Sequence, residues 1–108
     1  MLLIKAIVRP EKAPVVMKSL FESGFPGITK MTVYGRGKQR GLKVGDITYD
    51  ELTKNLLMIV INDADKDFVV QTILDNAKTG TTGQFGDGKI FIEPVLEAWT
   101  ISKGIKEL

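Results

Sequence analysis

The chain has 108 residues, of which 44% are hydrophobic and 26% charged, and these proportions predict one globular domain with a modest core. Its 15 basic and 13 acidic residues leave a formal net charge of +2, which argues against general nucleic-acid binding, because such binders neutralise many phosphates. The absence of Cys and His excludes disulfides, thiolate nucleophiles and the commonest general base and metal ligand.

The N-terminal segment predicts a strand over residues 2–8, since branched apolar residues run up to Arg9-Pro10. No small-residue cleavage site follows the short apolar start, and no apolar run reaches the ~20 residues of a membrane span, so we expect a cytoplasmic protein. Pro10 is predicted in the first turn of a helix of about four turns that ends at Gly24. Apolar residues of this helix recur every three or four positions: Ala13, Val16, Met17, Leu20 and Phe21.

The middle of the chain predicts two strands around a long loop. Residues 28–35 alternate and are rich in strand-forming side chains, and residues 54–61 form a nearly unbroken apolar run that is typical of an interior strand. Between them, residues 36–50 are rich in glycine and basic side chains and predict a loop without regular structure. A loop of this length in a compact domain is often functional.

The C-terminal half predicts a second helix, a glycine-rich loop and a fourth strand. Asp63 or Asp65 is expected to be the N-cap of the helix. The glycine-rich residues 79–88 lead to a strand at 89–96, where Pro94 favours a sheet edge or a bulge. The C-terminal tail gives no clear pattern. The helix itself is indicated by Phe68, Val69, Thr72, Ile73 and Ala77.

The order β-α-β-β-α-β predicts an α+β fold, a ferredoxin-like sandwich with two helices on one face of a four-stranded antiparallel sheet. The helices leave the other face of the sheet without a cover. In a chain this small, association of several copies is the simplest way to bury that face.

Two glycine-containing loops are candidates for anion binding. Residues 86–89, Gly-Asp-Gly-Lys, combine backbone N–H groups with a cation, although the same residues also favour a simple tight turn. Their spacing is not that of a GxxxxGK[ST] phosphate loop, and a strand rather than a helix follows. Residues 36–41 place Arg and Lys beside glycines, which suits phosphate or carboxylate and equally a solvated loop. Nucleic acid fits this loop less well, because few aromatic residues lie among the charges.

Three further features allow more than one interpretation. Asp50 and Glu51, which follow Tyr49, either bind a divalent ion or a basic partner or are simply solvated. Trp99, the only tryptophan, is expected in the core or in an interface. An enzyme such as a small phosphate hydrolase is disfavoured, because His and Cys are absent and no carboxylates are visibly paired across a cleft.

Four segments together resemble the PII family of nitrogen-regulatory signal-transduction proteins over nearly the whole chain. Residues 82–95, TGQFGDGKIFIEPV, fit the family's C-terminal signature at every constrained position. Residues 35–41, GRGKQRG, are similar to the base of the family's long T-loop, and residues 52–54, LTK, to the point where that loop returns to the sheet. The opening residues 6–10, AIVRP, fit in register as well.

The resemblance implies a trimer that binds ATP or ADP in clefts between subunits. With Mg²⁺ and ATP in place, 2-oxoglutarate joins the site, and the conformation of the T-loop then controls a partner protein. The family's parts map onto one domain, residues 1–108, with the T-loop at about 36–53, the B-loop at about 79–89 and the C-terminal tail at about 98–108.

The same resemblance implies roles for individual residues. Lys38 is expected to contact phosphate, Gln39 to help hold Mg²⁺ and 2-oxoglutarate, and Lys54 to pair with a carboxylate of 2-oxoglutarate. The phosphate-facing B-loop is expected to consist of Gly86, Asp87, Gly88 and Lys89, and the adenosine pocket to include Ile7, Thr29 and Gly35.

The chain also departs from the family pattern. Its T-loop is shorter and lacks the Y-R-G-A-E-Y modification motif, so the resemblance does not imply modification of Tyr49. Its B-loop is longer, because Thr79-Gly80-Thr81 precedes the matching segment. Thr100 and Ser102 stand where two arginines usually grip phosphates, with Lys103 beside them.

The short T-loop, together with Met58 in place of a family glutamate, most resembles the nitrogenase-associated branch of archaea and anaerobic bacteria. That branch works as a pair of paralogous subunits and inhibits nitrogenase. The resemblance therefore implies a homotrimer or a mixed trimer, with nitrogenase components as partners. The missing tail arginines leave open a PII-like trimer that senses another adenyl nucleotide or a small anion.

Overall fold

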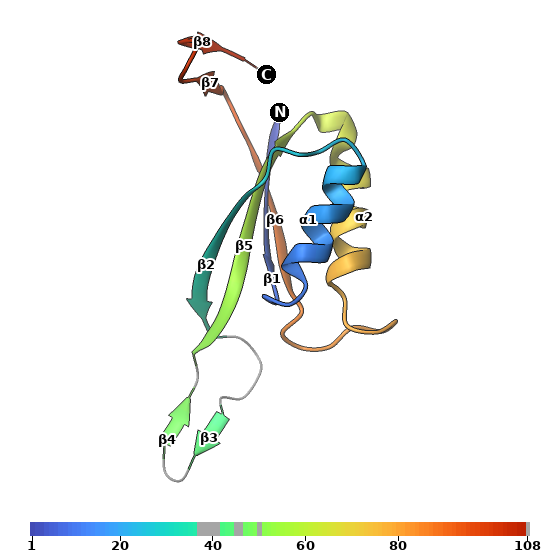
Figure 1. Cartoon of the computed structure of the whole chain (residues 1–108), viewed down its shortest axis with the longest axis vertical. Helices are drawn as coiled ribbons and strands as arrows, with labels where there is room; N and C mark the ends of the chain where they lie inside the picture. The colour runs from blue at the N-terminus through green and yellow to red at the C-terminus, as the bar shows by residue number, and fades with distance from the viewer. Residues whose placement is uncertain (37–41, 45–46, 50, 108) are drawn as a thin grey trace.

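The computed structural model describes residues 1–36, 42–44, 47–49 and 51–107 (Figure 1). Four long strands and two helices form the body of the molecule. These elements are β1 (Leu2–Val8), α1 (Ala13–Glu22), β2 (Thr29–Gly35), β5 (Leu52–Ile61), α2 (Lys66–Ala77) and β6 (Gly88–Pro94). The shorter elements are β3 (Leu42–Val44), β4 (Ile47–Tyr49), a 3-10 turn (Asp63–Asp65), β7 (Trp99–Thr100) and β8 (Ile105–Lys106).

The four long strands form one antiparallel sheet in the order β2-β5-β1-β6. Figure 1 shows α1 and α2 side by side on one face of this sheet. The predicted ferredoxin-like βαββαβ sandwich is therefore confirmed. β6 lies at the edge of the sheet, as Pro94 predicted, because an edge strand tolerates the missing N–H of a proline.

The core fills the space between the sheet and the two helices. Alternate residues of β1 and β5 point into it, as the pleat of a strand requires, and meet one side of each helix. Its most deeply buried large side chains are Ile4, Val8, Val16, Leu20, Val69 and Ile73.

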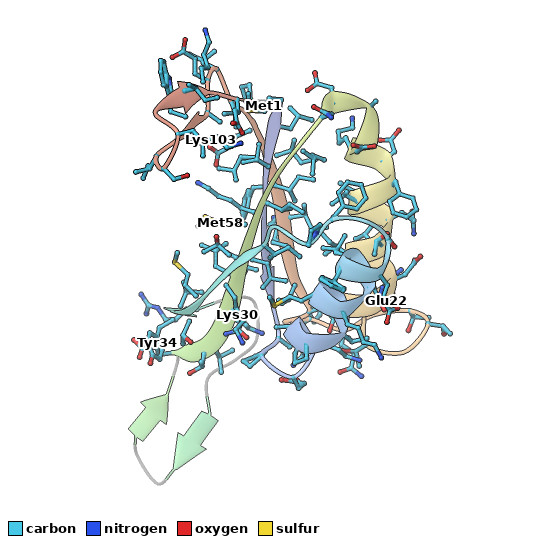
Figure 2. The ribbon with its side chains drawn as sticks, turned by 45° about the horizontal axis from the view of Figure 1, so that its top comes forward. Met1, Glu22, Lys30, Tyr34, Met58 and Lys103 are labelled. Atoms are coloured by element: carbon cyan, nitrogen blue, oxygen red, sulfur yellow. The ribbon has the colours of Figure 1, made fainter. Side chains whose placement is uncertain are left out.

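The opposite face of the sheet, called the open face below, combines apolar and charged side chains, and no helix of the described residues covers it. It consists of the side chains that alternate with the core residues of β1 and β5 and of their register partners in β2 and β6. Met31 and Phe91 are exposed there by 42% and 45%, and Lys5 pairs with Glu93 at 2.8 Å. Figure 2 shows Met58 on the side of the sheet away from Glu22 of α1.

Three local predictions were wrong. The predicted loop 36–50 contains the short strands β3 and β4, which pair with each other in antiparallel orientation. The first helix has ten residues rather than about four turns. It begins at Ala13, so Pro14 lies in its first turn, while Pro10 belongs to the preceding turn.

The start of the second helix is more complex than a single N-cap. Asp65 occupies the N-cap position of α2, but its side chain makes no capping hydrogen bond. Asp63 begins the 3-10 turn and accepts a hydrogen bond from the N-terminal ammonium of Met1 at 2.6 Å. Neither helix among the described residues has the length and apolar character needed to cross a membrane.

Candidate functional site

The segment between α2 and β6, residues 78–87, is called the glycine loop below. It enters β6 through Gly88, whose φ of 119° lies in the region that favours glycine. A Cβ atom on Gly88 would lie 1.7 Å from the carbonyl oxygen of Ile7 in β1. The end of the loop is therefore pressed against β1, and only glycine fits there.

The carboxylate of Asp87 organises the glycine loop from within. Its Oδ1 accepts hydrogen bonds from the Arg9 Nε at 3.0 Å and from the Thr79 hydroxyl at 2.5 Å. Its Oδ2 accepts hydrogen bonds from the backbone N–H groups of Thr79 and Gln84, both at 2.9 Å. The Asp87 carboxylate thus binds the start of the loop at Thr79 and its second half at Gln84.

These contacts stabilise the charged form of Asp87. Burial alone raises the pKa of this carboxyl, but the hydrogen bonds from Thr79 and Gln84 and the ion pair with Arg9 outweigh burial. Together they hold the pKa well below its usual range. Asp87 was predicted as part of a phosphate-facing loop of residues 86–89, and in the structure its carboxylate binds groups of the protein itself.

Lys54 joins the start of β5 to the glycine loop. Its ammonium donates a hydrogen bond to the carbonyl oxygen of Gly86. Burial, and next the positive charge of Arg9, lower the pKa of Lys54, while Glu11 and Asp87 oppose the shift. Two cations and the loop therefore converge at one end of the sheet.

The structure brings most of the predicted site residues to this end of the sheet. Ile7 is the register partner of Lys89, and Gly35 ends β2 close to the start of β5, where it faces Leu52. Thr29 lies at the opposite end of β2 from Gly35. A strand of seven residues separates its two ends by about 20 Å. Lys38 and Gln39 lie outside the described residues, as does Asp50 of the predicted divalent-ion site.

A cavity of about 840 Å³ lies beside the glycine loop, between α2 and β6. Its apolar wall comes from both elements, and Lys78 and Lys89 lie among its lining residues. The volume is in the range of small-molecule sites in proteins. The apolar wall is formed by Val70, Ile73, Leu74, Ala77, Ile90 and Ile92.

Sequence reasoning missed the contribution of α2 to this cavity, and also the contacts of Arg9 and Thr79 with Asp87. The α2 side chains gave only the periodicity of a core-facing helix. The family signature began at Thr82, but Thr79 is the threonine that binds Asp87. The only sequence signal for the role of Asp87 was that an acidic residue lies in a glycine-rich loop.

The C-terminal tail projects from the far end of the body. Trp99 is 60% exposed and donates a hydrogen bond to Glu97, so the prediction that it lies in the core is wrong for a single chain. Lys103 pairs with Glu107 at 3.2 Å. Figure 1 shows β7 and β8 at the end of the molecule opposite the glycine loop, and Figure 2 shows Lys103 far from Tyr34. Thr100 and Ser102 therefore cannot reach the glycine loop of their own chain.

Comparisons with known proteins identify the family of the chain. The family model described as Nitrogen regulatory protein P-II matches residues 1–105. The "Nitrogen fixation nifHD region GlnB-like protein 1" of Methanothermococcus thermolithotrophicus is 54% identical over 104 residues, which are 96% of each chain. The protein of the same name from Methanothermobacter marburgensis is 48% identical over 94% of this chain and 93% of its own. "Nitrogen regulatory protein P-II 2" of Methanothermobacter thermautotrophicus is 44% identical over 94% of this chain and 89% of its own. A family match over almost the whole length and relatives of this similarity show that the chain belongs to the nitrogen regulatory protein P-II family.

Proposed function

We propose that this chain is a regulatory subunit that binds ATP or ADP, and then 2-oxoglutarate, in clefts between copies of itself. The observation that carries the proposal is the convergence of the glycine loop with Lys54 and Arg9 at one end of the sheet. Polyphosphates and dicarboxylates are the anions that backbone N–H groups and such cations recognise. We propose a binding role rather than catalysis, since the contacts of Lys54 and Arg9 serve to position charge and backbone groups.

The nucleotide phosphates are proposed to lie against the glycine loop. Gly88 and Lys89 line the cavity beside this loop, and the resemblance adds Gly86 and Lys38 as further phosphate contacts. Mg²⁺ is a hard cation that prefers oxygen ligands, and the amide oxygen of Gln39 is of that kind. Gln39 and the phosphate oxygens of ATP are therefore the proposed ligands of Mg²⁺.

A second copy is proposed to complete each cleft. Thr29 and the tail lie far from the glycine loop of their own chain, so they reach such a site only in a neighbouring copy. The open face offers apolar side chains for this association, and its exposed Met31 and Phe91 favour burial. We propose a homotrimer, or a mixed trimer with a paralogous subunit.

Nitrogenase components are the proposed partners, controlled through the T-loop in the cytoplasm. The support is the wording "nitrogen fixation nifHD region" in the names of several close relatives. Lys54 lies directly after the T-loop, and its contact with Gly86 links the base of that loop to the proposed phosphate site. A ligand that binds Lys54 therefore acts directly on the base of the T-loop and can change its conformation.

Replacing Lys54 by glutamine is expected to lower the affinity for 2-oxoglutarate by about tenfold or more, since a charged partner of a carboxylate is lost. Affinity for ATP alone is expected to stay within about threefold, because the glutamine amide can still donate to the Gly86 carbonyl. Isothermal titration calorimetry with 2-oxoglutarate in the presence of saturating MgATP measures the first effect.

Lys66→Gln is the matched control, because it removes the same charge at the start of α2. It is expected to bind 2-oxoglutarate like the wild type. Absence of any 2-oxoglutarate heat in the wild type under these conditions would refute the sensor proposal. Unchanged affinity in Lys54→Gln would refute the role of that lysine.

A further inference from the structure

We infer that Arg9 is a positioning residue for the proposed phosphate site, because it sets the direction of a backbone N–H group in the glycine loop. The inference rests on the proposed nucleotide binding and assigns Arg9 an indirect role at that site, through the glycine loop. Arg9 follows β1, and its backbone carbonyl accepts hydrogen bonds from the N–H groups of Lys12 and Ala13. Its main chain is thus fixed between the sheet and α1.

The Arg9 guanidinium holds the glycine loop at two points. Its Nε donates to Asp87 Oδ1 at 3.0 Å, and its terminal Nη2 donates to the Phe85 carbonyl oxygen at 2.9 Å. Only 19% of the Arg9 side chain is exposed, so water competes weakly for the part-buried bond to Asp87, whereas the bond to Phe85 lies at the surface. A planar guanidinium presents its donors in a rigid fork, so the two contacts fix the loop segment in orientation as well as position.

The hydrogen bond from Arg9 to the Phe85 carbonyl oxygen determines where the N–H group of Gly86 points. In a planar trans peptide, the C=O of Phe85 and the N–H of Gly86 point in opposite directions. Because Arg9 binds the carbonyl, the Gly86 N–H is directed away from Arg9. Among the described residues, that N–H donates no hydrogen bond, so it is available to an anionic ligand.

Lys54 strengthens the same arrangement from β5. Its ammonium binds the Gly86 carbonyl, so acceptors on three consecutive residues, 85 to 87, are all occupied by Arg9 and Lys54. These acceptors face the two cations, which partly neutralise them. The N–H of Asp87 donates to the Gln84 carbonyl oxygen at 3.2 Å, so the Gly86 N–H is the group left for phosphate. Phosphate binds such backbone N–H groups where carbonyl oxygens do not repel it.

The test compares ATP with adenosine in Arg9→Gln, with calorimetry as the measurement. Loss of the positioned N–H is expected to weaken ATP binding by about tenfold, while adenosine, which has no phosphate, keeps its affinity within about twofold. Arg9→Lys retains the charge but not the fork, so its ATP affinity is expected to lie between those of the wild type and Arg9→Gln. Lys18→Gln removes the same charge from the exposed side of α1 and is expected to have no effect.

The outcomes separate the inference from the proposed function. Wild-type protein that binds no ATP would refute nucleotide binding itself, and this inference with it. If the wild type binds ATP and Arg9→Gln binds it equally well, only the role of Arg9 is refuted. Equal losses for ATP and adenosine would show general damage to the fold, and full recovery in Arg9→Lys would show that charge alone matters. Either result would overturn the positioning role.

Discussion

Replacing Gly88 by alanine is expected to lower the free energy of unfolding by roughly 3–5 kcal/mol and to abolish nucleotide binding. The added Cβ would lie 1.7 Å from the Ile7 carbonyl oxygen and 2.8 Å from the Ile7 carbonyl carbon. The positive φ of Gly88 adds backbone strain for any residue with a side chain. β1 cannot retreat, because it is hydrogen-bonded to β5 on its other side. Urea denaturation followed by circular dichroism measures the loss.

Gly80→Ala is the matched control for this prediction. Gly80 also has a positive φ, of 64°, but no heavy atom lies within 4 Å of the position its Cβ would take. We expect this variant to lose only about 1 kcal/mol, which is the cost of the backbone conformation without the clash. Similar losses in the two variants would contradict the close approach of Gly88 to β1.

The second large effect is expected for Asp87→Asn, at roughly 2–4 kcal/mol of unfolding free energy. The substitution leaves the Arg9 guanidinium without its carboxylate, although only 19% of the Arg9 side chain is exposed. The asparagine amide also brings N–H donors to a place where Thr79 and Gln84 already present donors. Asp67→Asn, at a side chain that is 97% exposed, is the control and is expected to change stability very little.

The Asp87 effect has a defined dependence on pH. The pKa of Asp87 is lower in the folded state than in the unfolded state, where it is about 4. The contribution of its charge to the free energy of unfolding is therefore complete above about pH 4, and it is lost as the pH falls through the lower pKa of the folded state. The stability difference between wild type and Asp87→Asn is therefore expected to be constant near neutral pH and to shrink below about pH 4. If the stability difference between wild type and Asp87→Asn stayed constant down to the pH of acid unfolding, the stabilising role of the charged Asp87 carboxylate would be contradicted.

Apolar periodicity was sufficient to predict the body of the fold. Four strand-like segments, at residues 2–8, 28–35, 54–61 and 89–96, and the spacing of the apolar residues in two helices were enough to predict these elements. The pair of strands β3 and β4 was missed, since its short alternation was outweighed by the glycine and basic residues around it. For Trp99 the sequence left the core and an interface open, because a single sequence does not tell whether an apolar side chain packs within its own chain or against another copy. Its exposure excludes the core of a single chain, and the interface stays a prediction.

The candidate site was predicted less completely than the fold. The glycine loop and Lys54 were identified because they match family motifs that are continuous in the sequence. The contacts of Arg9 with Phe85 and Asp87 join residues that are 76 and 78 positions apart, and a single sequence contains no signal for such a pairing. Thr79 and Asp87 are only eight residues apart, but two other threonines stand in the same loop, so the partner was not determined by composition.

The most direct test of the account is the mass and nucleotide stoichiometry of the protein in native mass spectrometry with ATP, because the proposed site needs more than one copy of the chain. We expect a species of three times the 11.9 kDa chain mass that carries up to three ATP molecules. Phe91→Asp, on the open face, is expected to yield smaller species that lose ATP, whereas Phe21→Asp, at an exposed position of α1, is expected to behave like the wild type. A wild-type monomer that binds ATP by itself would contradict the shared cleft.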